Sequence, residues 1–536
     1  MIGLACALPL LAGVVLLGGG TELSARAASR TGIGASLIAL VLVAVAWATD
    51  AGIDLLWLPS LDLRLHLGLD GISGPLAVLA AAVTAAACVT TLADRPRGGS
   101  SATFVGCLLL TLAGALATFA ARDAVLFVIA FELVLVPMWV LITRFGDARD
   151  PEARREAGAR FVIYTGVGST LMLLGVLLLV SRAGTADLAA LAAARGEGLG
   201  SGTQLTIAVL LTLGLAVKVP VWPLHSWLPL AHTTAPTAGS MILAAVLLKM
   251  GTYGLVRLPM ATVPDGFARI APVLAVCGAV GIVWGGLVCL VERELKRLIA
   301  WSSIAHMGFV ALALATGTAT GVTAALYGNL AHGVISALLF LVVGGLKHRW
   351  GGDDLDIARA PLREHAPRTG LLLMTGLAAG LGLPGLAGFW GEFTAIIAAL
   401  DPGEGRSAAL FAGCAAVAAV GAALAAAYAL RVARLVWWGE GHAAATGPAE
   451  AADVTEDPED EPTRVMPAAT SVLPVVTRDE EQTVEQWEDP ATKGEELALA
   501  ELVPGAVLAL AVLVLGVAPG LVLAVTDPAL ATVVTR

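Results

Sequence analysis

Apolar runs, most of them close to 20 residues long, recur along the 536-residue chain and are separated by short polar segments. A helix of about 20 apolar residues crosses a hydrocarbon core about 30 Å thick. The pattern therefore predicts an all-α polytopic membrane protein with about 14 transmembrane helices. The predicted spans lie near residues 2–20, 33–48, 70–92, 103–120, 124–143, 161–181, 205–224, 237–256, 270–291, 297–317, 322–346, 370–400, 408–437 and 501–526.

Two of these runs contain residues that end helices. Pro220 and Pro223 interrupt the seventh run, and Pro384 and Gly385 lie inside the twelfth. Proline removes a backbone donor and glycine adds conformational freedom, so both helices should be discontinuous. Non-helical backbone at membrane depth is tolerated only where protein or a water-filled cavity surrounds it. The two interruptions therefore predict a transport route.

The interruptions also suggest how the chain is divided, because paired broken helices are typical of inverted repeats. We expect three N-terminal helices in 1–100, five-helix repeats in 101–258 and 259–438, and one last helix in 499–536. Between them, residues 440–496 carry 16 acidic residues against three basic residues. Such a composition is typical of disordered segments, so 439–498 is predicted to be a largely disordered insertion.

Residues 54–70, DLLWLPSLDLRLHLGLD, alternate apolar and polar positions between the second and third spans. This alternation is compatible with a short β-hairpin or with a segment that lies on the membrane surface. The sequence does not decide between them.

Composition and charge support the membrane interpretation. Hydrophobic residues make up 57% of the chain and charged residues only 14%, whereas about a quarter of a soluble domain is charged. Loops after odd-numbered spans carry 17 Lys and Arg residues against eight in the others. The positive-inside rule then places the odd loops and the acidic insertion in the cytoplasm, and both termini outside. The first run lacks a basic leader and is expected to be a retained helix.

Four charged residues lie within apolar runs: Glu132, Lys218, Lys249 and Glu392. A charge at mid-membrane depth costs about 2.5–3.5 kcal/mol on insertion scales, so such residues usually mark ion or proton paths. Lys218 is expected near the middle of its helix, with Glu132 as its partner. A pair that opens and closes would switch the proton affinity of Lys218. The alternative is a static buried pair that holds two helices together.

Four histidines lie in or beside the same runs: His225, His232, His306 and His332. The ordinary pKa of histidine is about 6.5, so these side chains are candidates for a hydrated proton relay. Each taken alone is equally compatible with a structural hydrogen-bonding role.

No sequence pattern for a redox cofactor or a metal site is present. The six cysteines lie singly in apolar runs, without metal-ligand or redox spacing, and are expected to be small buried hydrophobic residues. Phosphate-binding glycine motifs and iron–sulfur cysteine clusters are lacking. We expect no cofactor in this chain.

Five segments together resemble the antiporter-like subunits of respiratory complex I, and among them the M-type subunits. They are AFELVLVPMWVLI, LAVKVPVWPLHSWLPLAHTTAPTAGS, ILAAVLLKMGTYG, ELKRLIAWSSIAHMGF and GLPGLAGFWGEF, and they cover the fourth to the thirteenth span. The resemblance implies a proton-pumping subunit of NADH:quinone oxidoreductase in a bacterial cytoplasmic membrane. It also implies paralogous antiporter-like neighbours, with FMN, iron–sulfur clusters and quinone held by partner subunits.

Residue by residue, the resemblance matches Glu132 and Lys218 to the family's switching pair, Lys249 to its central lysine and Glu392 to the terminal acid. Leu230 and Thr234 depart from it, because acidic or polar residues are common there. Two other functions remain open: a subunit of a multisubunit cation/proton antiporter, and a non-transporting membrane scaffold. Scaffolding gives no reason to keep charges in apolar helices.

Overall fold

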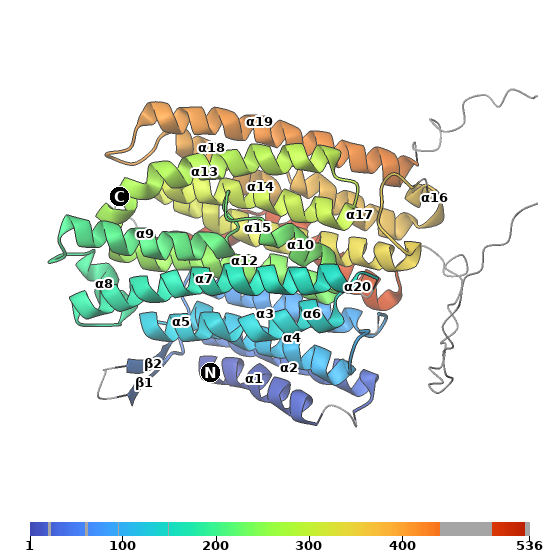
Figure 1. Ribbon diagram of the computed structural model, residues 1–536, viewed down its shortest axis with the longest axis horizontal. Coiled ribbons are helices and arrows are strands. Elements are labelled where there is room, and N and C mark those ends of the chain that lie inside the picture. Colours follow the sequence, from blue (N-terminus) through green and yellow to red (C-terminus); the bar gives the residue numbers. More distant parts are fainter. Residues whose placement is uncertain are drawn as a thin grey trace, which may run out of the picture.

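The computed structural model describes residues 1–19, 23–58, 63–94, 96–147, 149–357, 359–439 and 496–530. The described chain is a bundle of helices that run roughly side by side, with one small hairpin at its edge (Figure 1). The N-terminal part contains α1 (Ile2–Gly18), α2 (Ala25–Ala48), β1 (Ile53–Leu58), β2 (Leu63–Leu67), α3 (Ser73–Thr90), α4 (Ser101–Ala120), α5 (Ala124–Leu133), α6 (Leu135–Phe145), α7 (Pro151–Ala183), α8 (Leu188–Ala194), α9 (Ser201–Lys218) and α10 (Trp227–Thr234).

The rest of the chain continues the bundle. It contains α11 (Thr237–Ile242), the π-helical turn η2 (Leu243–Leu247), α12 (Leu248–Leu255), η3 (Val256–Met260), α13 (Pro264–Val291), α14 (Leu295–Ala315), α15 (Ala319–Trp350), α16 (Leu362–His365), α17 (Pro367–Gly380), α18 (Ala387–Leu400), α19 (Ala408–Val432), η4 (Ala433–Trp438), α20 (Leu499–Val517) and α21 (Gly520–Leu530).

The predicted membrane-spanning architecture is confirmed. Within the described residues, twelve helices are long and apolar enough to cross a membrane, and Ile2–Gly18 and Ala387–Leu400 are shorter apolar helices. The number fourteen, the inverted repeat and the domain limits stay predictions. The acidic insertion 439–498 lies almost wholly outside the described residues. The last predicted span is divided, since α20 ends at Val517 and α21 begins at Gly520.

The segment 54–70 forms the hairpin. Strands β1 and β2 are antiparallel, with Ile53 opposite Leu67. An isolated bridge joins Leu67 to Ala121, just before α5, and His66 Nδ1 lies 3.3 Å from Asp187 Oδ2, just before α8. The hairpin therefore lies against the starts of both helices. It stands at the left-hand end of the bundle in Figure 1.

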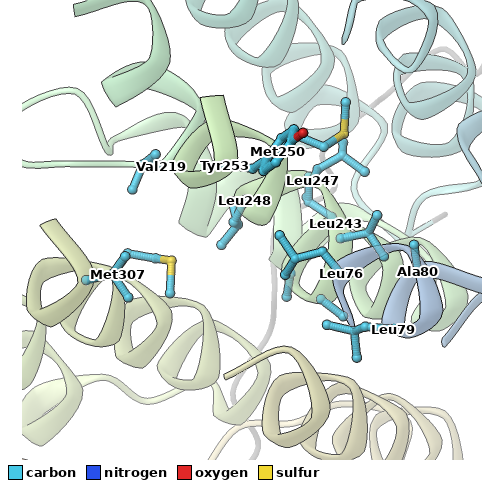
Figure 2. Packing of buried hydrophobic residues seen from close by; sticks show 14 of the residues in the cluster. Leu76, Leu79, Ala80, Val219, Leu243, Leu247, Leu248, Met250, Tyr253 and Met307 are labelled. Carbon is cyan, nitrogen blue, oxygen red and sulfur yellow. The ribbon is translucent and has the colours of Figure 1, made fainter. Parts of the chain in front are cut away.

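Burial separates the helices into two groups. In the segment 237–260 and in α15, every residue of the most apolar 18-residue stretch is buried. In the corresponding stretches of α2, α7, α13 and α19, half of the residues or fewer are buried. In lipid, an exposed apolar face costs nothing, so outer helices can stay hydrophobic all round. Figure 2 shows the interior packing, with Leu243 and Leu247 beside Leu76 and Leu79 of α3. Polar groups on the two inner helices are therefore shielded from lipid.

Candidate functional site

The first break begins directly after Lys218. Helix α9 ends at that residue, and 219–226 is not helical before α10 starts at Trp227. Pro220 and Pro223 both lie in this segment, as predicted. Trp227 Nε1 donates a hydrogen bond of 3.0 Å to the Val217 carbonyl, which satisfies an acceptor that the broken helix cannot. The expectation that Lys218 lies near the middle of its helix is wrong; it is the last helical residue.

Glu132 and Lys218 do not form an ion pair among the described residues, although the Glu132 charge acts on Lys218. Lys218 Nζ lies over two aromatic rings instead, 5.0 Å from the centre of Phe131 and 5.7 Å from that of Phe161. Glu132 Oε1 is buried without a hydrogen-bond partner within the described part of the chain. Glu132 and Lys218 are therefore not paired in the structure, and two aromatic faces contact the cation instead; the switching role of the two residues stays a prediction.

Lys249 lies at the centre of the bundle, fully buried in α12. Its Nζ donates a hydrogen bond of 2.8 Å to the Ala244 carbonyl and lies 2.5 Å from His332 Nδ1 on α15. Ala244 belongs to the π-helical turn η2, where the hydrogen-bonding register shifts by one residue. A carbonyl is thereby left free for the lysine. The π turn had no recognised signal in the sequence.

The second break places Glu392 beside His306. Helix α17 ends at Gly380 and α18 begins at Ala387, with Pro384 between them. Gly385 has a φ of +89°, which only glycine adopts without strain, and this explains the glycine at that position. Glu392 Oε1 lies 2.7 Å from His306 Nδ1, and both side chains are nearly buried. The predicted discontinuous helix is confirmed.

The two histidines connect the central lysine with the second break. The rings of His306 and His332 lie 5.5 Å apart between centroids. A cavity of about 20 Å³ is lined by both histidines and by Glu392. That volume is enough for about one water molecule, and the cavity offers it several polar partners. Two hydrogen-bonded pairs, Lys249–His332 and His306–Glu392, therefore meet at this cavity inside the membrane-spanning bundle, and we call the four side chains the polar connection.

The remaining two predicted histidines are not hydrogen-bonded to this connection among the described residues, although the charge of Lys249 reaches His232. His225 lies in the first break with its ring 5.5 Å from that of Trp301, and its Nδ1 lacks a partner among the described residues. His232 is completely buried in α10 and stacks on Phe340 at 4.4 Å. Neither ring nitrogen of His232 has a hydrogen-bond partner within the part of the chain that the structure describes. The charges of Lys249 and Lys296 both act on this ring.

Sequence reasoning missed the aromatic rings that hold Lys218 and the glycines that make room for the cavity. A Cβ on Gly391 would lie 2.6 Å from Gly328 Cα, so the glycine at 391 permits the close approach of α15 and α18. Phe131 adjoins Glu132 in the sequence, but only the packing of α5, α7 and α9 brings both rings to Lys218. In the described part of the chain, no group of three His, Cys, Asp or Glu residues could hold a metal.

Comparison with known proteins supports the resemblance. Residues 121–417 match the family described as NADH:quinone oxidoreductase/Mrp antiporter, transmembrane. A protein of Picosynechococcus sp., named NAD(P)H-quinone oxidoreductase chain 4 1, is 38% identical over 391 residues, covering 72% of this chain and 70% of the relative. A protein of the same name from Synechococcus sp. is 37% identical, covering 72% of this chain and 71% of the relative.

Solved structures share the fold along nearly the whole chain. A chain of respiratory complex I from Thermus thermophilus with bound NADH has a TM-score of 0.79 and 26% identity, covering 98% of each chain. A chain of the Mrp complex from Dietzia sp. has a TM-score of 0.77 and 22% identity, covering 99% of this chain and 98% of the other. The match at 22% identity shows the fold alone. The family match over residues 121–417 and the relatives at 37–38% identity show that this chain belongs to the NADH:quinone oxidoreductase/Mrp antiporter transmembrane family.

Proposed function

We propose that this chain is a proton-translocating membrane subunit of an NADH:quinone oxidoreductase. The observation that carries the proposal is the connection from Lys249 through His332 and His306 to Glu392. Four ionisable side chains that are joined by hydrogen bonds or by adjacent rings, and are mostly buried in the bundle, are costly unless they serve a path. Their order leads from the centre of the bundle to the second break.

The open Glu132–Lys218 arrangement supplies a switch. Pairing with Glu132 favours the charged form of Lys218, and separation favours proton release. Moving one charge against 100 mV costs about 2.3 kcal/mol, and a pKa change of one unit corresponds to about 1.4 kcal/mol. The switch must therefore change the proton affinity by more than one or two units of pKa. One ion pair at low dielectric is strong enough for that.

The partners and cofactors are inferred from the family. The similar proteins of Synechococcus and Picosynechococcus carry the name of a quinone oxidoreductase chain, and the similar chain from Thermus thermophilus belongs to respiratory complex I. We propose that FMN, iron–sulfur clusters and quinone are bound by partner subunits, and that quinone reduction there drives the protons outward. Paralogous antiporter-like subunits would lie on either side of this chain in a bacterial cytoplasmic membrane.

An antiporter subunit is the second candidate, because the Mrp complex chain has the same fold. The curated relatives at 37–38% identity favour the oxidoreductase. Affinity purification of the tagged chain from its native membrane distinguishes the two functions. Co-purification with flavin- and iron–sulfur-containing subunits supports the oxidoreductase, whereas a complex without them supports the antiporter.

The central test is Lys249→Ala in membranes, with proton uptake and NADH-driven quinone reduction measured on inverted vesicles. We expect the rate of proton uptake to fall about tenfold or more, because the connection loses its first member. Arg269→Ala serves as a control, since Arg269 is exposed on α13. Normal proton uptake and normal electron transfer in assembled Lys249→Ala complexes would make Lys249 a structural residue and refute the proposal.

A further inference from the structure

Several loops meet at the end of the bundle where α6, α10, α13 and α15 finish, which is the right-hand end in Figure 1. The Asp147 amide donates a hydrogen bond of 2.8 Å to the Thr234 carbonyl, so the loop after α6 contacts the end of α10. The Leu295 amide donates one of 2.9 Å to the Asp353 carbonyl, so the loop after α15 contacts the start of α14. By the positive-inside rule this end faces the cytoplasm.

Charged side chains form a compact cluster at this junction, which we name the junction cluster: Asp147, Lys347 and Asp353. Lys347 Nζ lies 3.0 Å from Asp353 Oδ1 and 3.4 Å from Asp147 Oδ2. Burial acts to raise the pKa of Asp147, but its hydrogen bonds from Arg149 and the Lys347 charge outweigh this and hold the pKa below its ordinary range. The Asp147 side chain of the cluster therefore stays a charged carboxylate at this end of the bundle.

Lys296 lies directly beneath this cluster and is 3% exposed. Its Nζ donates a hydrogen bond to the Ala235 carbonyl at the end of α10, and its amide donates one of 2.8 Å to Asp353 Oδ2. Among the described residues, Lys296 makes no ion pair with any carboxylate. A buried ammonium without a counter-ion in contact is costly, so its position requires a reason.

His232 lies in α10, three residues before Ala235, whose carbonyl accepts the hydrogen bond from Lys296. Its ring lies where the charges of both Lys296 and Lys249 reach it, and both ring nitrogens lack partners among the described residues. Leaving a buried polar group unsatisfied costs about 1–3 kcal/mol. Helix α10, WLPLAHTT, contains no acidic residue of its own. A buried histidine within reach of the charges of two buried lysines has the chemistry of a proton carrier.

We propose that Lys296 is the proton-uptake residue on the cytoplasmic side, receiving protons beneath the junction cluster and delivering them to Lys249 through His232. The proposal rests on the proposed function, since it extends the connection from Lys249 to the cytoplasm. The titratable and charged groups around Lys296 come from segments far apart in the sequence: Asp147, Lys347, Asp353, Asp94 and His232.

Each transfer moves one proton and balances in charge. The Lys296 ammonium gives up a proton and becomes a neutral amine, while the His232 imidazole becomes an imidazolium. The imidazolium passes that proton to the neutral amine of Lys249 and returns to its neutral form, with water molecules carrying the proton across any gap. The Lys296 amine then takes the next proton from cytoplasmic water drawn to the carboxylates of the junction cluster.

The test compares Lys296→Arg, Lys296→Met and Lys296→His in inverted vesicles that contain the whole membrane complex. Arginine keeps the charge and a donor for the Ala235 carbonyl but does not release a proton, because its pKa exceeds 12. Methionine keeps the length without the charge. We expect both to lower the rate of proton uptake at least fivefold. Histidine titrates near pH 6.5 and should restore part of the rate, more at pH 6.5 than at pH 8.

The controls separate this inference from the proposed function. Arg297→Gln changes the neighbouring, exposed cation and should leave the rate unchanged. If Lys249→Ala blocks uptake while Lys296→Arg and Lys296→Met pump normally, the inference is wrong and the function stands. If Lys249→Ala also pumps normally, the function itself fails. If Lys296→Arg takes up protons faster than Lys296→His, or if none of the three variants assembles, Lys296 is a structural residue and the inference is overturned.

Discussion

The two broken helices carry their charges in opposite arrangements. At the first break, Lys218 is separated from Glu132 and lies over Phe131 and Phe161. At the second break, Glu392 is paired with His306 at 2.7 Å beside a cavity. In the function that we propose, the first region is therefore an open switch, whereas the second is a proton conduit that begins at Lys249.

We infer from this contrast that one kind of sequence signal serves two tasks in this protein. Proline and glycine end the helix in both regions, because neither residue supports a continuous helical backbone there. The task of each break depends on its neighbours: aromatic rings surround the first cation, and histidines surround the second acid. Variants that act on one region and not on the other can therefore test whether the two tasks are separate.

The largest effect is expected at the second break. Glu392→Gln removes the acid from the conduit but keeps the shape, so proton uptake should fall about tenfold or more in inverted vesicles. His306→Gln should lower the rate of proton uptake by a similar factor. The double variant should be little slower than either single variant, because the effects of substitutions within one network are not additive. Asp401→Asn, at an exposed position after α18, is the control. Additive losses would contradict a single conduit.

A smaller effect is expected at the first break from Glu132→Gln. It removes the charge that modulates Lys218 but leaves Lys218 and the conduit in place, so we expect proton uptake to fall about three- to tenfold. Glu132→Asp keeps the carboxylate at a shorter reach and should lie between Glu132→Gln and the unmodified chain. Unchanged pumping in Glu132→Gln would show that the open pair is not a switch.

The smallest effect is expected from the aromatic rings. A cation–π contact contributes about 0.5–2 kcal/mol. Phe131→Leu removes one such contact and should therefore destabilise the position of Lys218 away from Glu132. We expect a two- to fivefold change in the rate of proton uptake. Phe127→Leu, one turn earlier in α5, removes a similar ring that stacks on Phe131 without lying over Lys218. Equal effects of the two variants would indicate packing rather than a role in holding the cation.

Much of the fold could be predicted from the sequence. Apolar runs predict membrane helices because lipid offers no partner for backbone groups, so that a helix must satisfy them internally. The breaks at Pro220, Pro223 and Pro384 are consequences of the same local chemistry. The four charges inside apolar runs, Glu132, Lys218, Lys249 and Glu392, were identifiable too, because such charges are rare. All of these are properties of short stretches of chain.

Tertiary packing determines which of these charges meet. Lys249 and His332 lie 83 residues apart, and His306 and Glu392 lie 86 apart, so no local pattern predicts their contacts. The pairing of Glu132 with Lys218 was expected from charge, but packing of Phe131 and Phe161 offers the lysine another position. Lys296 lies in the segment ELKRLIAWSSIAHMGF, but nothing in that segment indicates that the lysine is buried, because its burial comes from distant parts of the chain. Proximity across helices depends on packing, which a linear sequence does not display.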